Sequence, residues 1–294
     1  MVEDPIGTYD PLLGNDGPRA GHPYYRGGYK IWPGAEEVAN AVFRILCIGN
    51  STSLWPASAW SLELGKKLRR YGHSVAIYNG AGKGHSSSQE LLRVIRDAPA
   101  IKPDLIISLS GICDIGYLVN AKGYPFLHKY SRKAMEYLKR SDIVSDISHG
   151  YPDSAGPAEV WCRNQRLANV VSAELGIKHI VLLQPVQGIG SYPATAEELE
   201  FLDQKSRVVL RAADVPYITA VRDFYAEVRD IMAREPEKYK HIVDFTSIFD
   251  NVPGAYRDHR HQSQLGVEHI ATQVEKLISP ILSELASENR QAGA

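Results

Sequence analysis

The sequence predicts an α/β fold in which helices cover both faces of a parallel, mainly five-stranded sheet, as a three-layer α/β/α sandwich of the flavodoxin-like type. Short apolar runs typical of buried strands alternate along the chain with segments of helical periodicity. The 294 residues are 44% hydrophobic and 23% charged, which is enough apolar sequence for a sizeable core. No shift in composition marks a second domain, so we expect one domain over residues 43–286.

The first strand is FRILCIG at residues 43–49, which is apolar and ends at a glycine. The preceding residues 1–42 are rich in Gly, Pro and Tyr and predict an irregular arm packed on the domain. A helix over 57–71 follows the strand, with basic residues near its end and Gly72 beyond it. Its inward-facing leucines are Leu62, Leu64 and Leu68.

The strand and helix alternation then continues to the C-terminal end of the domain. The further strands are predicted at 74–79, 104–110, 179–185 and 242–249, and the further helices at 89–97, 158–175, 196–212, 218–234 and 264–285. The pattern breaks over 115–157, where a polar, aromatic-rich insertion with one helix near 131–139 is a candidate lid or substrate-shaping region. Residues 287–294 are predicted to be a flexible tail.

Composition excludes several classes of partner. The 33 basic and 34 acidic residues nearly cancel, so no global field attracts nucleic acid or an anionic membrane surface. No segment approaches the roughly 20 apolar residues of a membrane span, and no export signal is visible, so we expect a cytoplasmic protein unless a leader has been removed. The three cysteines are an odd number and contain no CxxC pair, which argues against a disulfide framework and a structural zinc site. They are Cys47, Cys113 and Cys162.

A serine turn directly follows the first strand, at the edge where open parallel sheets place their sites. In Gly49-Asn50-Ser51, a tight turn between strand and helix would expose the Ser51 hydroxyl beside backbone N–H groups. That arrangement suits a nucleophile and an oxyanion site together. The alternative is that Ser51 or Ser53 caps the following helix.

A second polar motif, Asp258 to His261, precedes the last helix. An aspartate three residues before a histidine can orient the imidazole while the other ring nitrogen faces a nucleophile. The pattern alone is weak, because Asp and His are common on surfaces. His259 is an alternative base, and His259 with His261 could suggest a metal pair, but no HExxH motif accompanies them.

The glycine-rich loop 79–86 after the second strand fails two nucleotide-binding patterns. The dinucleotide motif requires glycine where His85 stands, and the phosphate loop requires Ser or Thr after Lys83, where Gly84 stands. What remains is a loop whose backbone can approach another group closely and donate N–H groups.

Taken in order, these motifs resemble the SGNH hydrolase family, the GDSL-like esterases, over about residues 43–286. Residues 49–51 correspond to the family's G-D-S block, Gly84 to its oxyanion glycine, residues 111–114 to G-x-N-D, and residues 258–261 to D-x-x-H. The G-x-S-x-G elbow of α/β-hydrolases fits less well, because it requires glycine at position 53.

The resemblance implies a triad of Ser51 as nucleophile, His261 as base and Asp258 as the acid that orients it. It also implies an oxyanion hole from the N–H groups of Ser51 and Gly84, with Cys113 as a third member. The candidate substrate-binding residues are Asn50, Asp114 and Tyr117. Neither a metal nor an organic cofactor is expected.

Two residues depart from the family pattern. Asn50 replaces the first-block aspartate, and Cys113 replaces an asparagine whose amide donates to the oxyanion. A thiol is a weak donor, and losing one oxyanion donor can cost about 10²–10³ in turnover. A slow site, another donor and a loss of hydrolysis therefore all remain open. Cys113 could also be only a small buried residue, and its use as nucleophile is less consistent because Ser51 holds that position.

The implied reaction is hydrolysis of O-acyl esters, with O-acetyl groups on a carbohydrate as the preferred hypothesis. Aromatic and polar side chains in the insertion and after the fourth strand suit stacking and hydrogen bonding to a sugar. They are Tyr117, Tyr124, Phe126, His128, Tyr130, Gln184, Gln187 and Tyr192. An O-acyltransferase with the same triad and a ligand-binding module without turnover remain alternatives, and the sequence does not fix the oligomeric state.

Overall fold

A seven-stranded sheet forms the centre of the molecule. The computed structural model describes residues 10, 12–14, 16–17, 25–34, 37–38, 40–54, 59–70, 72–118, 155–210 and 214–292. The order across the sheet is β1 (Tyr25–Arg26), β2 (Tyr29–Trp32), β4 (Val75–Asn79), β3 (Phe43–Gly49), β5 (Leu105–Ser110), β6 (Lys178–Leu183) and β9 (Ile242–Asp244). The five strands from β4 to β9 are parallel, whereas β1 and β2 are antiparallel additions at one edge.

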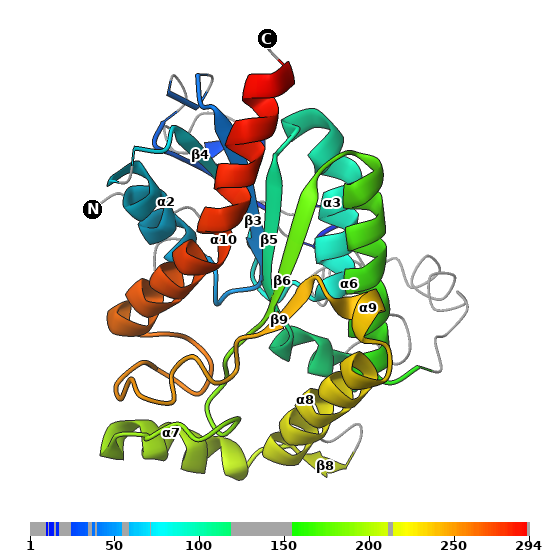
Figure 1. Ribbon diagram of the computed structural model, residues 1–294. Helices are drawn as coiled ribbons and strands as arrows, with labels where there is room; N and C mark the ends of the chain where they lie inside the picture. Colours follow the sequence, from blue (N-terminus) through cyan, green and yellow to red (C-terminus); the bar gives the residue numbers. More distant parts are fainter. Residues whose placement is uncertain are drawn as a thin grey trace.

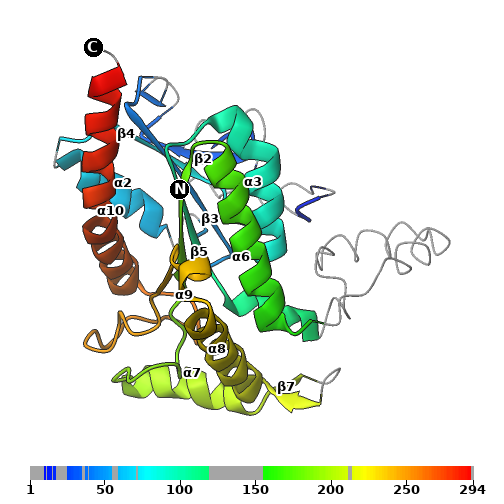
Figure 2. The same ribbon diagram turned by 45° about the vertical axis from the view of Figure 1, so that its right-hand side comes forward.

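Helices cover both faces of this sheet (Figures 1 and 2). They are α2 (Trp60–Arg70) and α10 (Gln264–Ala292) on one face, and α3 (Ser87–Ile101) and α6 (Pro157–Glu174) on the other. α8 (Tyr217–Arg234) packs against α6 and the 3₁₀ helix η1 (Ile112–Leu118). If the five parallel strands are numbered by their order along the chain, they lie across the sheet in the order second, first, third, fourth and fifth. This is the doubly wound arrangement. The three-layer α/β prediction is therefore confirmed.

Alternation of side chains on the central strands divides the core between the two faces. Ile45 and Cys47 of β3 face α2 and α10, while Leu46 and Ile48 face α3 and α6. All four are essentially inaccessible. A strand buried on both faces needs the continuous apolar run that identified FRILCIG in the sequence.

Where the structure describes it, the arm predicted over residues 1–42 is not irregular throughout, because it contains the strands β1 and β2. β2 pairs antiparallel with β4, with Lys30 opposite Asn79, and Tyr29 and Ile31 are buried in the core. A four-residue strand among glycines carries too few alternating positions to stand out as periodic. The arm therefore extends the sheet beyond the five strands expected.

Several predicted boundaries also differ from the structure. β9 ends at Asp244, because the Asp244 carboxylate accepts hydrogen bonds from the Thr246 N–H at 2.9 Å and hydroxyl at 2.6 Å and turns the chain. α7 (Ala196–Ser206) ends before a short hairpin of β7 (Val209–Leu210) and β8 (Val215–Pro216). α10 continues to Ala292, so the backbone of residues 287–292, predicted as tail, is helical. Leu62 is only half-buried, unlike Leu64 and Leu68.

The predicted insertion lies mostly outside the described residues. Its first residues form η1, and its helix near 131–139 falls in the part that is not described.

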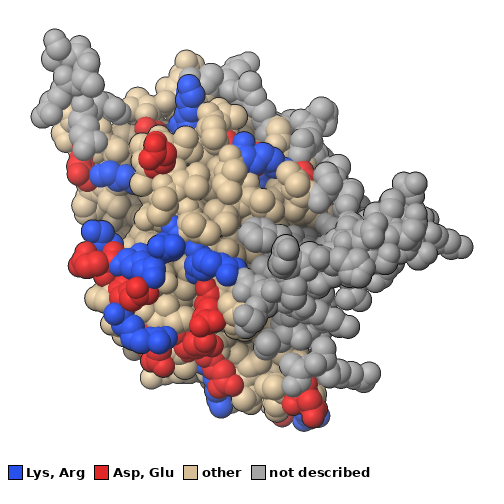
Figure 3. Space-filling view, turned by 90° about the vertical axis from the view of Figure 1, so that its right-hand side faces the viewer, with Lys and Arg blue, Asp and Glu red and all other residues tan. Residues whose placement is uncertain are grey.

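On the face shown in Figure 3, basic and acidic side chains are interspersed. Within the described ranges, every helix is too short or too polar to cross a membrane. The three cysteines form no disulfide.

Candidate catalytic site

The turn that carries Ser51 begins at a glycine that no other residue could replace without strain. Gly49 ends β3 with φ +149°, and a Cβ at this position would lie 2.5 Å from the Leu109 carbonyl oxygen of β5. The chain then forms a turn in which the Ser53 N–H donates to the Asn50 carbonyl at 3.0 Å. Ser51 is therefore held at the carboxyl end of the central strand, with its side chain half-buried.

Two buried asparagines fix this turn. The Asn50 amide nitrogen donates to Gln184 Oε1 at 2.7 Å, and Asn50 Oδ1 accepts from the Thr52 N–H at 3.0 Å. The Asn79 amide nitrogen donates to the Ser53 carbonyl at 2.8 Å. Asn50 is 1% exposed and its amide is bonded inside the protein, so its predicted contact with substrate stays a prediction. Its role here is to hold the turn against β6.

The helix-capping alternative for Ser51 and Ser53 is also wrong. The described helix that follows starts at Trp60, so neither serine is its N-cap residue. Ser53 instead accepts a hydrogen bond from the Trp60 indole at 2.8 Å and is fully buried. The hydroxyl of Ser51 is thus left for another partner.

That partner is His261. Its Nε2 lies 2.8 Å from Ser51 Oγ, and its Nδ1 lies 2.7 Å from Asp258 Oδ2. Asp258 Oδ1 accepts from the backbone N–H groups of Arg260 at 3.0 Å and of His261 at 2.9 Å, which shapes the tight loop before α10. The structure therefore brings the three residues of the predicted triad together in one hydrogen-bonded chain.

Hydrogen bonds to Asp258 keep its carboxylate ionised. Burial by itself raises the pKa of Asp258, but hydrogen bonds from the His261 ring and from the two backbone N–H groups outweigh it. The pKa is consequently held well below its ordinary value, and the carboxylate stays ionised at neutral pH. An ionised partner at Nδ1 favours the histidine tautomer whose Nε2 can accept a proton from Ser51.

His259 occupies a different environment and is not placed to act as the base. Its Nε2 lies 3.1 Å from the Tyr217 hydroxyl, away from Ser51. Burial, with the nearby cations Arg260 and Lys205, lowers the pKa of His259 to about 3, so its ring is neutral. In the described part of the chain, no three His, Cys, Asp or Glu side chains are grouped to hold a metal ion.

Two backbone N–H groups near Ser51 are available as donors. Those of Ser51 and Gly84 donate to no residue that the structure describes. Gly84 adopts φ +72° in the loop between β4 and α3. The same loop is joined to the end of β3, because the Gly82 N–H donates to the Gly49 carbonyl at 3.1 Å. This places the loop alongside the Ser51 turn.

Cys113 and Asp114, in the stretch 111–114 that corresponds to the family's G-x-N-D block, have different surroundings. Cys113 is half-buried in η1 and, like Tyr217, packs against the apolar cluster under α8. Asp114 is fully buried and accepts from the Ser87 hydroxyl at 2.5 Å and N–H at 3.0 Å at the start of α3. The carboxylate of Asp114 is thus bonded inside the protein, and its predicted contact with substrate stays a prediction. Tyr117 lies in η1, and its side chain is outside what the structure describes.

The residues proposed for sugar binding after β6 are used inside the protein. Gln184 and Gln187 are buried, with Gln184 bonded to Asn50 and the Gln187 amide donating to the Glu198 carbonyl. The Tyr192 hydroxyl donates to the Glu198 carboxylate and accepts from the Ala255 N–H at 3.1 Å. The side chains predicted for this role in the insertion are outside the described residues.

Glu198 is a residue that sequence reasoning missed. Its carboxylate, on α7, accepts from the N–H groups of Gly254 at 3.2 Å and Tyr256 at 2.9 Å. It thereby fastens α7 to the loop that leads to Asp258, and both lie beyond the strand ends in Figure 1. Its pattern with Thr195, a capping box at the start of α7, was visible in the sequence, but its partners 56 and 58 residues away were not.

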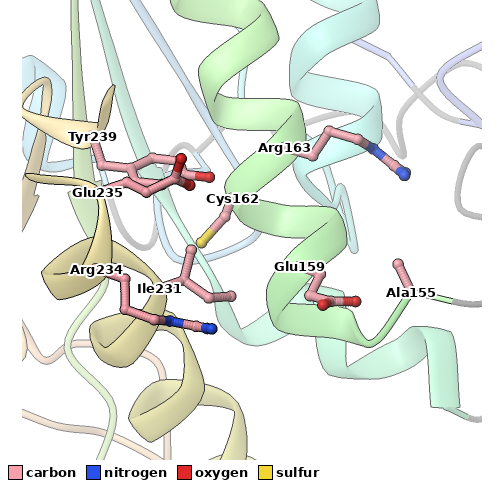
Figure 4. Close-up of a pocket in the computed structure, with 8 residues that line it drawn as sticks. All are labelled: Ala155, Glu159, Cys162, Arg163, Ile231, Arg234, Glu235 and Tyr239. Atoms are coloured by element: carbon pink, nitrogen blue, oxygen red, sulfur yellow. The ribbon is translucent and has the colours of Figure 1, made fainter. Parts of the chain in front are cut away.

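A cavity of about 430 Å³ lies away from the triad, between α6, α8 and α9 (Pro236–Tyr239), as Figure 4 shows. Burial raises the pKa of Cys162, whose thiol borders this cavity, to about 12, so it is not a ready nucleophile. None of the triad residues lines it. Its lining consists of Ala155, Glu159, Cys162, Arg163, Ile231, Arg234, Glu235 and Tyr239.

Comparison with known proteins identifies the fold. No protein-family model matches the chain, and neither does any curated protein sequence. Among solved structures, a variant of the acetyl-xylooligosaccharide esterase Axe2 from Geobacillus stearothermophilus matches with a TM-score of 0.50 and 16% identity, over 81% of this chain and 95% of that one. This likeness shows a shared fold and agrees with the expected three-layer α/β sandwich.

Two further structures match less closely. The acetyl xylan esterase AlAXEase has a TM-score of 0.49 and 13% identity, over 80% of this chain and 99% of that chain. A GDSL-like lipase from Bacteroides thetaiotaomicron has a TM-score of 0.45 and 13% identity, over 84% and 95% of the two chains.

Proposed function

We propose that this chain is a serine esterase of the SGNH type that hydrolyses O-acetyl esters of carbohydrates. The single observation that carries the proposal is the chain of hydrogen bonds from Asp258 through His261 to Ser51, at 2.7 and 2.8 Å. Nucleophile, base and orienting acid within hydrogen-bond reach are the geometric signature of acyl transfer. All three residues lie beyond the carboxyl ends of the strands, where α/β sheets bind their ligands.

In the proposed reaction, His261 Nε2 accepts the proton of Ser51 Oγ as the oxygen attacks the ester carbonyl carbon. Asp258 remains ionised and stabilises the imidazolium. The carbonyl oxygen becomes negative and is bound by the N–H groups of Ser51 and Gly84. As the bond between the carbonyl carbon and the sugar oxygen breaks, His261 gives the proton to that oxygen, and the sugar leaves with a free hydroxyl. Water, deprotonated by His261, then attacks the acetyl-enzyme, which releases acetate and restores Ser51.

The acetyl-carbohydrate preference draws its support from the fold shared with the acetyl-xylooligosaccharide esterase. The expected result is release of acetate from acetylated xylo-oligosaccharides, measured by an enzyme-coupled acetate assay, with little hydrolysis of long-chain p-nitrophenyl esters. The reverse order of activities would reject the carbohydrate assignment while leaving the triad in place.

Replacing Cys113 with asparagine is expected to accelerate the proposed reaction. The side chains are similar in size, and an amide in η1 would supply a donor that a thiol supplies poorly. We expect kcat for p-nitrophenyl acetate to rise by up to about 10²-fold, the scale of one oxyanion donor. Cys113→Ala is the matched control, because it removes the thiol without adding a donor. An acceleration in both variants, or in neither, would show that the oxyanion is not bound at this position.

A further inference from the structure

We propose that the substrate of this site carries an oxyanionic group, a carboxylate or a phosphate, which Arg260 and Lys205 bind beside the triad. The inference rests on the proposed esterase function and narrows the class of its substrate. It depends on Tyr217 and three residues near it in the fold. We call these four residues, Lys205, Tyr217, His259 and Arg260, the Tyr217 cluster.

The cluster is assembled from three separate elements. Tyr217 is the first residue of α8, and its ring meets that of His259 edge to face, with centroids 5.5 Å apart. Lys205 of α7 places its Nζ 6.0 Å from the centroid of the Tyr217 ring. Arg260 directly follows His259 in the chain, its side chain is half-buried, and its positive charge helps to lower the pKa of the His259 ring.

The cluster adjoins the triad. His259 Nδ1 lies 3.7 Å from Asp258 Oδ1, and the Arg260 N–H donates to the same oxygen at 3.0 Å. Arg260 directly precedes His261, whose ring is bonded to Ser51. A group bound by Arg260 would therefore belong to the molecule whose ester lies at Ser51.

The two cations have no carboxylate partner in the part of the chain that the structure describes. No ion pair involves Lys205 or Arg260, and the Arg260 Nε is buried without an acceptor there. Asp258, the acid whose Oδ1 accepts from the Arg260 N–H, already accepts hydrogen bonds from the His261 ring and from two backbone N–H groups. The cluster thus has a surplus of positive charge, although the whole chain has a net charge of −1.

Two other arginines that are fully or partly buried in the described part of the chain are paired with carboxylates. Arg93 pairs with Asp16 at 2.7 Å, and Arg229 pairs with Asp244 at 2.8 Å. Leaving a guanidinium partly buried and unpaired is costly, and a planar guanidinium binds the two oxygens of a carboxylate or phosphate in a matching geometry. A ligand oxyanion would supply the missing partner at Arg260, with Lys205 adding a second charge.

The test compares substrates that differ only in charge. An O-acetylated methyl glucuronoside is compared with its uncharged methyl ester and with the corresponding acetylated sugar phosphate. We expect kcat/KM to be about tenfold to 100-fold higher for a charged substrate than for the methyl ester, the scale of one charge-assisted hydrogen bond. The advantage should shrink at about 1 M salt. Whichever of the carboxylate and the phosphate reacts faster identifies the oxyanion.

Matched variants locate the effect. In Arg260→Gln, we expect kcat/KM for the charged substrate to be only about one to three times that for the neutral substrate. In Lys205→Gln, we expect the ratio to fall by a smaller amount. Lys240→Gln, which removes an exposed lysine paired with Glu237, should keep the full ratio. Equal kcat/KM for charged and neutral substrates in the wild type, or an unchanged ratio in Arg260→Gln, would overturn the proposal.

A binding measurement separates this inference from the esterase proposal. Calorimetric titration of Ser51→Ala with the glucuronoside and its methyl ester reports recognition without turnover. If the neutral ester is hydrolysed but charge confers no advantage in binding or rate, the oxyanion proposal alone fails. If no ester is hydrolysed but Ser51→Ala binds the charged sugar selectively, the esterase proposal fails and the binding site stands.

Discussion

Substitution of Ser51 by alanine is expected to lower kcat for p-nitrophenyl acetate by about 10⁶-fold, to near the background rate. The Ser51 hydroxyl is bonded to His261 Nε2 at 2.8 Å, so its removal takes away the proton that the base would accept. The effect is on kcat, because the oxyanion donors and the substrate surface remain. Stopped assays over a range of substrate concentration measure it, with circular dichroism to confirm folding.

Ser53→Ala is the matched control for this variant. Ser53 lies two residues away in the same turn, but its hydroxyl is buried and accepts from Trp60. Its loss should lower stability by about 1 kcal/mol and leave kcat within a few-fold of wild type. A Ser51→Ala protein that retains more than a small fraction of wild-type kcat would show that another group is the nucleophile.

Substitution of Asp258 by asparagine is expected to reduce kcat by about 10⁴-fold. The carboxylate accepts from His261 Nδ1 at 2.7 Å, and an amide at the same place would present N–H groups that favour the wrong histidine tautomer. The loop should persist, because an asparagine Oδ1 can still accept from the backbone N–H groups of residues 260 and 261. The loss should therefore be seen in kcat more than in melting temperature.

Asp250→Asn provides the comparison for Asp258→Asn. Asp250 lies in the same connection between β9 and α10 and accepts from the Ser191 N–H, but it has no contact with His261. Its replacement should leave kcat near the wild-type value. If the two variants lose activity equally, the loss reflects disturbance of the connection rather than of the histidine tautomer.

Much of the framework was predictable because its physical causes are local. The buried strand 43–49 is a continuous apolar run, and its bounds match β3. The grouping of Ser51, Asp258 and His261 was predictable because each residue follows a strand end or precedes a helix at a spacing that the SGNH resemblance supplies. The sequence could not give the distances, which are 2.7 Å from His261 Nδ1 to Asp258 Oδ2 and 2.8 Å from His261 Nε2 to Ser51 Oγ.

The surroundings that sequence could not supply are those of residues whose partners are distant in sequence. Asn50 and Asp114 stand in motif positions, yet their side chains are buried against Gln184 and Ser87. Glu198 holds a loop more than 50 residues further along the chain. Local pattern shows that such polar residues are present, but only the folded chain shows whether they are satisfied internally or left for a ligand.

The measurement that most directly tests the central claim is covalent labelling of Ser51 by a fluorophosphonate, read by intact mass and located by peptide mapping. The account predicts one adduct per chain, on Ser51, that forms in the wild type and in Ser53→Ala, forms slowly in Asp258→Asn and is absent in Ser51→Ala. A wild-type protein that remains unlabelled, or one labelled at another residue, would contradict a nucleophilic Ser51 activated by His261.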